Sequence, residues 1–427
     1  MEGAALREKL QKLRSVYRRE GFRGFWRKLL TRLWARALDV LSPAVLLRPR
    51  RSRRLIRQML AEGGERVILW RSSFGWDAPL YQRPQHIALA LARSGSLVVY
   101  EVSRATDGVA ALRRKEARLW LFNFSNPALR HWLLRELRRD PRPKYLQLYS
   151  TDWQLSSAQL ERWQRRGFRV IYEYVDAISP ALSGTGSLPK NVLDKYRYAL
   201  RHRDVYIVVT AERLRLDVLA RRGARRLITA TNGVDFAYFS GADPAFRPDP
   251  AFRRVLERGR PVVCYYGALA SWVDYALLRE IAATGRWSVV LFGIRYDDSF
   301  ERELGGGEDG IFFLGPRPYA QLRDYARRCD VMMIPFLIND LTRATSPVKL
   351  FEYMALKKPV VTTDLDECRR YPPVLIARSH AEFLSQLERA LTLREDAAYL
   401  ARLEAEARNN DWSAKARAIV EALKRDE

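Results

Sequence analysis

The sequence has few cysteines and no long apolar run, and these absences exclude several classes of protein. Only three cysteines, Cys264, Cys329 and Cys368, occur among 427 residues, and they lie far apart. This number and spacing argue against a disulfide framework or a zinc site and favour buried thiols in a reducing compartment. No stretch approaches the roughly 18 apolar residues of a membrane span. The N-terminus lacks the pattern of a signal peptide, so we expect a cytoplasmic protein.

Phosphate-binding loops of two common kinds are missing as well. No G-x-G-x-x-G sequence stands at a strand-to-helix turn, which counts against a nicotinamide-dependent oxidoreductase. The glycine-rich stretch at residues 305–310, GGGEDG, is not followed by Lys and then Ser or Thr, so it does not fit a P-loop. The sequence also has no zinc-finger spacing, no RNP-like motif and no convincing internal repeat, and nucleic-acid binding therefore finds little support.

Acidic residues are scarce relative to basic ones, and the imbalance is concentrated at one end. The chain has 75 Lys and Arg against 49 Asp and Glu, a net charge of +26, and residues 1–60 hold 17 of the basic and 4 of the acidic residues. Between residues 6 and 41, large apolar side chains recur every three or four positions, and arginines occupy the other faces. This pattern predicts an amphipathic helix lying on an anionic membrane surface. Docking on the protein's own core and nucleic-acid binding are the alternatives.

From about residue 65 the chain alternates between apolar strand-like runs and helix-like segments. Strands are expected in RVILW (66–70), SLVVYEV, KYLQLYS, FRVIYEYV and DVYIVV. The pattern loosens over residues 233–252, which are rich in Gly, Pro and Asp, and restarts with PVVCYYG (261–267), WSVVLFG (287–293), IFFLG (311–315), DVMMIPF (330–336) and KPVVTT (358–363). Continuous apolar strands separated by helices predict two doubly wound parallel sheets, each covered by helices on both faces. Ligands of such sheets bind beyond the carboxyl ends of the strands.

The stretch SPVKLFEYMALKKPVVTT (346–363) carries the clearest chemistry. Ser346 is expected as an N-cap and Pro347 as the first helical residue, which would make the helix start an anion site. Lys349 adds a positive charge in the first turn, and Glu352 lies one turn further on the same face. Phosphates at the helix start and a ribose diol at the carboxylate would match a nucleoside diphosphate. The alternative is a solvated ion pair between the two side chains.

Other strand ends add candidates for the same ligand. Gly267 follows the first strand of this half and Gly293 the second, where glycine allows the backbone to approach a bulky ligand. Arg295 and Arg343 are further phosphate candidates.

These motifs resemble GT-B-fold glycosyltransferases of the family 4, or group 1, kind. The likeness is carried by YYGALASWVDYALL (265–278), FFLGPRPYAQLRDYARRCDVMMIPF (312–336), SPVKLFEYMALKKPVV (346–361) and NGVDFAYF (232–239). In the N-terminal half, YQRPQHIALALARSG (81–95) and VIYEYVDAIS (170–179) look like a bacterial polysaccharide-transferase subgroup. The likeness covers about residues 65 to 425.

The resemblance implies a nucleotide sugar bound mainly by the C-terminal domain and an acceptor bound mainly by the N-terminal one. It makes Glu352 the ribose ligand and Lys349 a diphosphate contact, and it places the base near Arg317 to Tyr319. The last helix, from about Trp412, would cross back onto the N-terminal domain. The donor-binding candidates are thus Gly267, Arg295, Arg317, Tyr319, Arg343, Ser346, Lys349 and Glu352.

One departure from the family concerns the donor sugar. Many members carry a second Glu eight residues before the ribose-binding one, and here that position is Ala344. Asn339, Asp340, Thr342 or Arg343 could replace its contacts.

Catalytic candidates on the acceptor side are Asp176 and Asp77, which follow predicted strands, and His86, which lies early in a helix. The alternative to a catalytic role is a structural one: the aspartates would be turn residues, and His86 would be a packing residue of its helix. The Asp-x-Asp at 364–366 and the pair Asp297–Asp298 are interpreted as turn residues, so we expect no metal and no cofactor beyond the nucleotide-sugar substrate.

The sequence therefore predicts a hexosyl- or deoxyhexosyltransferase acting on a lipid-linked or growing saccharide in cell-surface polysaccharide synthesis. Its partners would be a nucleotide-diphosphate sugar, that acceptor and an anionic membrane, on the inner face of the plasma membrane. The expected division is an extension over 1–60, an acceptor domain over 61–236, a donor domain over 237–408 and a returning helix over 409–427. The alternative function is a non-catalytic nucleotide-sugar-binding or scaffold partner of a polysaccharide assembly complex.

Overall fold

The computed structural model describes residues 30, 34, 37–72, 74–78, 81–102, 107–152, 154–179 and 188–427. Most of the amphipathic helix predicted over residues 6–41 lies outside these residues. The chain divides into two compact units. The first comprises Met1–Ala78, Leu91–Ile171 and Ile178–Tyr198, and the second comprises Pro79–Ala90, Tyr172–Ala177 and Ala199–Glu427. The domain boundaries predicted at residues 60, 236 and 408 stay predictions.

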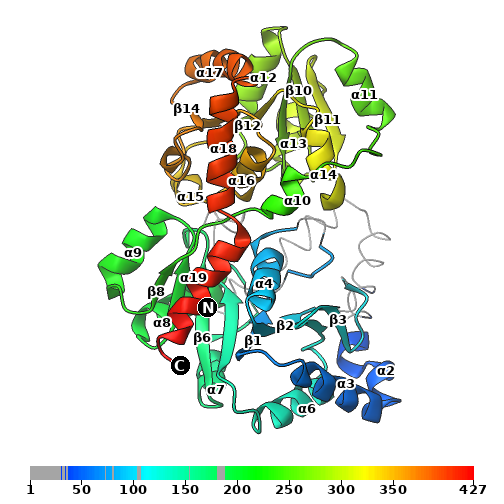
Figure 1. Ribbon diagram of the computed structural model, residues 1–427, viewed down its shortest axis with the longest axis vertical. Coiled ribbons are helices and arrows are strands. Elements are labelled where there is room, and N and C mark those ends of the chain that lie inside the picture. The colour runs from blue at the N-terminus through cyan, green and yellow to red at the C-terminus, as the bar shows by residue number, and fades with distance from the viewer. Residues whose placement is uncertain are drawn as a thin grey trace. The chain divides into compact units, whose positions relative to one another are not determined.

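The strands form two sheets (Figure 1). The eight-stranded sheet has the order β3-β4-β2-β1-β5-β6-β7-β8. Its strands are β1 (Arg66–Arg71), β2 (Ser96–Glu101), β3 (Leu112–Glu116), β4 (Leu119–Phe122), β5 (Lys144–Tyr149), β6 (Phe168–Tyr174), β7 (Tyr206–Val209) and β8 (Leu227–Thr229). The six-stranded sheet has the order β11-β10-β9-β12-β13-β14. It consists of β9 (Val262–Tyr266), β10 (Ser288–Phe292), β11 (Ile311–Gly315), β12 (Val331–Ile334), β13 (Val360–Thr363) and β14 (Leu375–Ala377).

The pairings of the six-stranded sheet are all parallel, and its strands are mostly buried on both faces. In the other sheet, β3 runs antiparallel to its neighbour β4. This strand was not predicted, because its sequence LRRKE is largely exposed and has no apolar run. Charged residues on an edge strand discourage pairing with another chain. The predicted doubly wound α/β architecture is otherwise confirmed.

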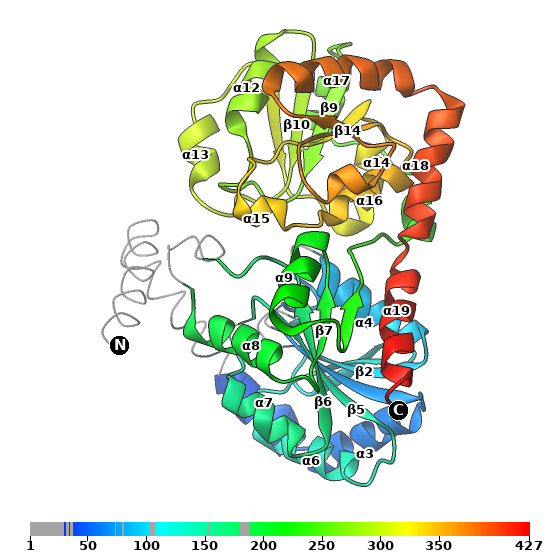
Figure 2. The same ribbon diagram turned by 90° about the vertical axis from the view of Figure 1, so that its left-hand side faces the viewer.

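Helices flank both sheets (Figures 1 and 2). Those of the N-terminal half are α2 (Pro43–Leu46), α3 (Pro49–Ala61), α4 (Arg83–Arg93), α6 (Pro127–Leu137), α7 (Ser157–Gln164), α8 (Lys190–Arg201) and α9 (Glu212–Arg222). Those that follow are α10 (Phe236–Ser240), α11 (Pro250–Leu256), α12 (Tyr275–Ala283), α13 (Ser299–Leu304), α14 (Tyr319–Ala326), α15 (Asp340–Arg343), α16 (Val348–Ala355), α17 (His380–Leu393), α18 (Ala397–Asn409) and α19 (Trp412–Lys424). Within the described residues, none is long and apolar enough to cross a bilayer.

The last helix lies against strands of the N-terminal half. Helix α19 begins at Trp412, with Asp411 as its N-cap, and it packs on β8. Near its other end, the Asp426 carboxylate accepts hydrogen bonds from Tyr206 Oη at 2.5 Å and from Arg226 Nε at 2.7 Å. These contacts lie within the second unit, and the return of this helix onto an N-terminal domain stays a prediction.

All three cysteines are buried and free. Burial raises the pKa of the Cys264 thiol well above its ordinary value and that of Cys368 to about 12. Neither thiol ionises at neutral pH, so both are packing residues, as the sequence led us to expect.

Candidate functional site

Helix α16 carries the two side chains on which the site is built. All residues from Leu350 to Ala355 are buried, so the helix is fixed within the core of the C-terminal half. Lys349 lies in its first turn, and Glu352 lies three residues further, on the same side. The strand β13 that follows is buried and continues the same core. The site therefore has a rigid support.

Ser346 does not cap this helix. The N-cap is Pro347, which has extended backbone and no side-chain cap. The prediction that Ser346 is the N-cap is wrong, because the helix starts one residue later than expected. The buried Ser346 Oγ has no hydrogen-bond partner among the described residues, whereas the backbone oxygen of Ser346 accepts a hydrogen bond from the Asn232 side chain. A buried hydroxyl without a partner is unfavourable, and a ligand at this helix start could satisfy it.

Two tyrosines hold the Glu352 carboxylate in place. Tyr266 Oη, at the end of β9, donates to Glu352 Oε2 at 2.7 Å, and Tyr319 Oη, at the start of α14, donates to Oε1 at 3.1 Å. Burial raises the pKa of Glu352, while these two hydrogen bonds and the Lys349 charge oppose the rise. The result is a buried carboxylate whose two oxygens have fixed directions.

Lys349 is a buried cation with no acidic partner in direct contact among the described residues. Its Nζ lies 5.3 Å from the ring centre of Tyr265 and 5.2 Å from that of Phe336, within the range of cation–π interactions. Among the described residues, no hydrogen bond or ion pair of this Nζ occurs. Burial lowers the pKa of Lys349 to about 8, although the Glu352 charge opposes the shift. Such a partly desolvated cation is suited to binding an anion.

A glycine after β9 lies next to Lys349, and a glycine after β10 lies against that first glycine. Gly267 follows β9 with φ +144°, and Gly293 follows β10 with φ +147°. A Cβ at Gly267 would stand 2.9 Å from Lys349 Cε, and one at Gly293 would stand 1.7 Å from the oxygen of Gly267. Both the conformation and the lack of space require glycine here. That a ligand approaches the backbone at these strand ends stays a prediction.

The three predicted arginine contacts each have partners within the protein. Arg295 pairs with Glu301 at 3.2 Å and lies over two phenylalanine rings, with its guanidinium carbon 4.7 Å from each ring centre. Arg317 pairs with Asp249 at 2.6 Å, and Asp249 is the N-cap of α11. This second pair is largely shielded from solvent, which suits a structural role for Arg317.

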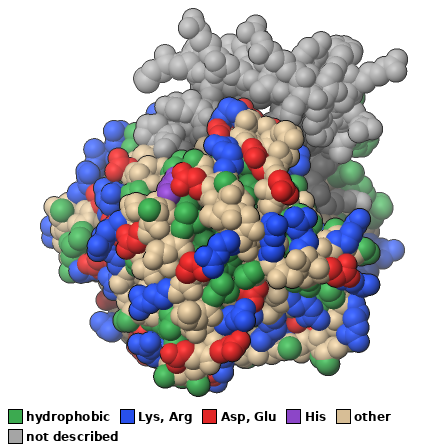
Figure 3. Space-filling model, turned by 90° about the horizontal axis from the view of Figure 1, so that it is seen from above, with side chains coloured by type: hydrophobic (Ala, Val, Ile, Leu, Met, Phe, Trp, Pro, Cys, Tyr) green, Lys and Arg blue, Asp and Glu red, His purple; other side chains and the backbone are tan. Residues whose placement is uncertain are grey.

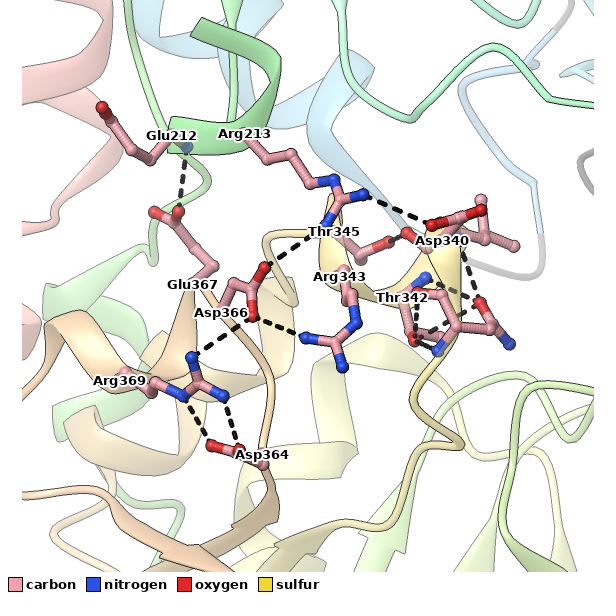
Figure 4. A network of polar contacts seen from close by, with 12 residues as sticks. Glu212, Arg213, Asp340, Thr342, Arg343, Thr345, Asp364, Asp366, Glu367 and Arg369 are labelled. Carbon is pink, nitrogen blue, oxygen red and sulfur yellow. Dashed lines mark hydrogen bonds and ion pairs between the residues drawn. The ribbon is translucent and has the colours of Figure 1, made fainter. Parts of the chain in front are cut away.

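Arg343 belongs to a larger network of ion pairs. Figure 4 shows Asp366 between three arginines: Arg343 at 3.3 Å, Arg369 at 3.5 Å and Arg213 at 3.7 Å. Asp364 is paired with Arg369. The aspartates of the Asp-x-Asp sequence thus neutralise arginines. Within the described residues, no group of three or more His, Cys, Asp or Glu side chains could hold a metal ion.

His86 packs among aromatic rings close to Glu352. Its ring stacks on Trp412, with centroids 4.8 Å apart, and its Nε2 lies 3.3 Å from Tyr319 Oη. Tyr319 therefore lies within hydrogen-bond distance of both His86 and Glu352. Burial lowers the pKa of His86 to about 3, so the ring is neutral at physiological pH.

The two carboxylate candidates lie in different surroundings. Asp176 follows β6, and burial raises its pKa to about 6, while a hydrogen bond with Thr345, next to the α16 start, opposes the rise. Asp77 lies in the first unit. It is exposed and forms an ion pair with Arg113 at 3.4 Å. The second unit therefore brings Asp176 to Thr345, close in sequence to the start of α16, and it brings His86 near Tyr319.

Sequence reasoning missed two features that organise this site. Tyr266 is part of a buried strand, and nothing in CYYG distinguishes it from a core tyrosine. The second feature is a buried ion pair between Arg83 and Glu173 at 2.8 Å, with side chains only 1% and 0% exposed. Arg83 also donates to the backbone oxygen of Thr231 and to Asn232 Oδ1. Ninety residues separate Arg83 from Glu173, and no local pattern could have predicted their contact.

The family model for glycosyl transferases group 1 matches residues 260–392. Residues 260–392 therefore resemble a group 1 glycosyltransferase domain. This domain contains Lys349, Glu352 and both glycines, so the predicted kinship is confirmed where the donor candidates lie. The TuaH protein of Bacillus subtilis (strain 168), named for a glycosyltransferase role in teichuronic acid biosynthesis, is 24% identical over 272 residues. The match spans 59% of this chain and 66% of TuaH, slightly under two thirds of that relative's length.

Solved structures confirm the GT-B fold that the sequence predicts. The Anabaena protein Alr3699/HepE, solved in complex with UDP, is 13% identical with a TM-score of 0.58, and the match covers 84% of this chain and 99% of HepE. Sucrose-phosphate synthase (tll1590) from Thermosynechococcus elongatus is 14% identical with a TM-score of 0.57, covering 84% and 98% of the two chains. At such identities the likeness concerns the fold alone.

Proposed function

We propose that the protein is a glycosyltransferase that moves a sugar from a nucleoside-diphosphate carrier to a saccharide acceptor. The carboxylate of Glu352, held one helical turn from the desolvated cation of Lys349, carries this proposal. A ribose diol would bind to the carboxylate, and the diphosphate would bind to Lys349, the start of α16 and the backbone at Gly267. The group 1 family match over this region supports the assignment.

In the proposed reaction, an acceptor hydroxyl oxygen bonds to the anomeric carbon of the donor sugar. The bond from that carbon to the diphosphate oxygen breaks, and the diphosphate leaves with the electron pair. Lys349 and the α16 amides would stabilise the charge that develops on this leaving group. The acceptor proton would pass to Asp176, whose pKa near 6 leaves it mostly ionised at neutral pH. His86, with its low pKa, would position Tyr319, and Asp77 has no role in this mechanism.

The acceptor and the cellular setting are finer parts of the proposal. TuaH is named for polysaccharide biosynthesis, and HepE was solved with UDP and with UDP-glucose. We therefore favour a UDP-hexose donor and a lipid-linked or growing cell-surface saccharide as acceptor. The basic residues 1–60 favour peripheral attachment to the inner face of the plasma membrane. We propose that no metal is needed, and EDTA should then leave turnover unchanged.

A thermal-shift screen with nucleoside diphosphates tests the donor assignment. A ligand at about 100 times its Kd should stabilise the protein by about 2.7 kcal/mol. We expect UDP to raise the melting temperature of the native protein but not of Glu352→Ala. Glu421→Ala, at an exposed position of α19, serves as the matched control and should respond as the native protein does. No shift with any nucleoside diphosphate would overturn the proposal.

A non-catalytic nucleotide-sugar-binding or scaffold protein is the second candidate. It is favoured by Ala344, which is fully buried at the position where many group 1 enzymes carry a second glutamate. Both candidates predict nucleotide binding, so release of UDP from UDP-sugars in the presence of acceptor lipids separates them. Binding without turnover, together with a cellular role that survives Glu352→Ala, would favour the scaffold.

A further inference from the structure

One surface of the first unit combines exposed leucines with arginines that have no acidic partner among the described residues. It is formed by α2 with Leu41 before it and Leu47 after it, by α3, by α6 and by the turn after α7. Helix α3 lies between α2 and α6 and packs against both (Figure 1). We call this surface the α2–α3–α6 face. It lies outside the group 1 glycosyltransferase domain.

The leucines of this face are unusually exposed. Leu41, Leu46 and Leu47 have 60%, 61% and 80% of their surface open to solvent. Among the described residues these are three of only ten large hydrophobic side chains that are exposed, and they lie within seven positions of one another. Exposed apolar side chains that cluster in this way mark interaction sites.

The backbone that carries these leucines is firmly anchored. Ser42 Oγ donates to the backbone oxygen of Ala110 at 3.0 Å, and Val45 is fully buried. The side chains of Asn123 and Asn126 donate to the backbone oxygens of the two residues before Leu41, at 3.1 and 2.9 Å. The leucines are thus presented by a fixed turn of the fold.

Arginines surround this apolar turn. On α3, Arg50, Arg51 and Arg54 are exposed, and along α6 and the turn after α7 a hollow is lined by His131, Leu134, Arg135, Arg138, Arg139 and Arg166. Within the described part of the chain, none of these arginines forms an ion pair. Elsewhere, for example on the surface seen in Figure 3, acidic and basic side chains are interspersed. The α2–α3–α6 face therefore has a positive charge that the described residues do not neutralise.

We infer that the α2–α3–α6 face docks on the surface of an anionic lipid bilayer. The anchored leucines would enter the apolar edge of the bilayer, and the arginines would contact lipid phosphates. A bilayer offers partners for both kinds of side chain, whereas a nucleic acid offers phosphates and leaves the leucines exposed. The inference locates the membrane contact proposed above for residues 1–60 on folded residues of the first unit, and it is independent of the proposed catalysis.

Vesicle co-sedimentation of the full-length protein tests the charged part. The vesicles are phosphatidylcholine with and without phosphatidylglycerol. An arginine near an anionic surface contributes about a fivefold gain in binding. The combined variant Arg51→Gln, Arg54→Gln, Arg138→Gln and Arg139→Gln should lower binding to the anionic vesicles at least about a hundredfold. A matched control removes the same charge from exposed positions elsewhere, Arg260, Arg389, Arg417 and Arg425, and should bind like the native protein.

A second variant tests the apolar part. Changing Leu41, Leu46 and Leu47 to serine should lower vesicle binding about tenfold or more, with an unchanged melting temperature. Serine at the exposed Leu216 and Leu337 is the control and should have no effect. The inference fails if the arginine variant binds like its control. It also fails if the arginine variant loses vesicle binding and the leucine variant does not. That result would indicate that the face binds another polyanion, such as RNA. If the leucine variant binds vesicles like the native protein but melts at a lower temperature, the chain's own residues cover the leucines. That result would also overturn the inference.

Discussion

Replacing Glu352 with glutamine should remove most of the affinity for a nucleoside diphosphate and keep the fold. Glutamine has the same shape, and the hydroxyls of Tyr266 and Tyr319 can each bond to one end of the amide, since a hydroxyl both donates and accepts. A carboxylate accepts with two oxygens and an amide with only one, so one ribose hydroxyl loses its acceptor. A hydrogen bond to a charged group contributes about 1.5–3 kcal/mol, which corresponds to a rise in Kd of about 10- to 150-fold.

The same variant has a defined effect on stability. Burial raises the pKa of Glu352 above its ordinary value of 4.5. The native contribution of this group to stability is therefore full below pH 4.5 and declines as the pH rises through the raised pKa, because a buried group must then ionise. Glutamine does not titrate. We expect the unfolding free energy of the variant, relative to the native protein, to increase from acidic to neutral pH.

Calorimetric titration with UDP and thermal unfolding at acidic and neutral pH measure the two effects. Glu421→Gln, at an exposed site, should change neither. The reasoning is refuted if Glu352→Gln keeps its Kd within about twofold of the native value, about 0.4 kcal/mol. It is refuted in another way if the variant unfolds at neutral pH, since the carboxylate would then be a structural requirement.

Three further substitutions have specific outcomes. Gly293→Ala should lower the free energy of unfolding, measured in urea, by more than about 3 kcal/mol, because its Cβ would stand 1.7 Å from a backbone oxygen. Gly306→Ala, where a Cβ would meet open space, should leave this free energy nearly unchanged. Lys349→Gln should weaken UDP binding but not uridine binding, and equal effects on both ligands would contradict a phosphate contact. The native protein should bind UDP more weakly as the pH rises through the lysine's pKa of about 8, and the variant should not show this pH dependence. Arg83→Met should destabilise by about 3–5 kcal/mol, because it removes the cation of a buried ion pair with Glu173, and a change under about 1 kcal/mol would contradict this reasoning.

The fold was predictable because its signals are local. Apolar runs such as PVVCYYG and WSVVLFG are long enough to identify buried strands, and the strands β9 and β10 occupy them. The position of Glu352 one turn after Lys349 also follows from the helical period alone. The edge strand β3 was missed because an exposed strand needs no apolar pattern.

The partners of the site residues could not be predicted, because they come from distant parts of the chain. Arg317 was expected near the base, and its contact with Asp249 joins residues 68 positions apart. The hydroxyl of Tyr266 meets Glu352 across 86 positions. Ser346 failed as a cap for a different reason, since a one-residue shift of a helix start depends on backbone angles that the sequence does not specify.

The three buried cysteines have a practical consequence. Because Cys264, Cys329 and Cys368 are inaccessible, a thiol-specific label added to the native protein should find little to react with. The unmodified sequence is therefore a ready background for single-site labelling. A cysteine introduced at Leu47, at the most exposed point of the α2–α3–α6 face, could carry an environment-sensitive fluorophore. Its emission would report whether that residue leaves water when vesicles are added, in a protein with every native residue but one.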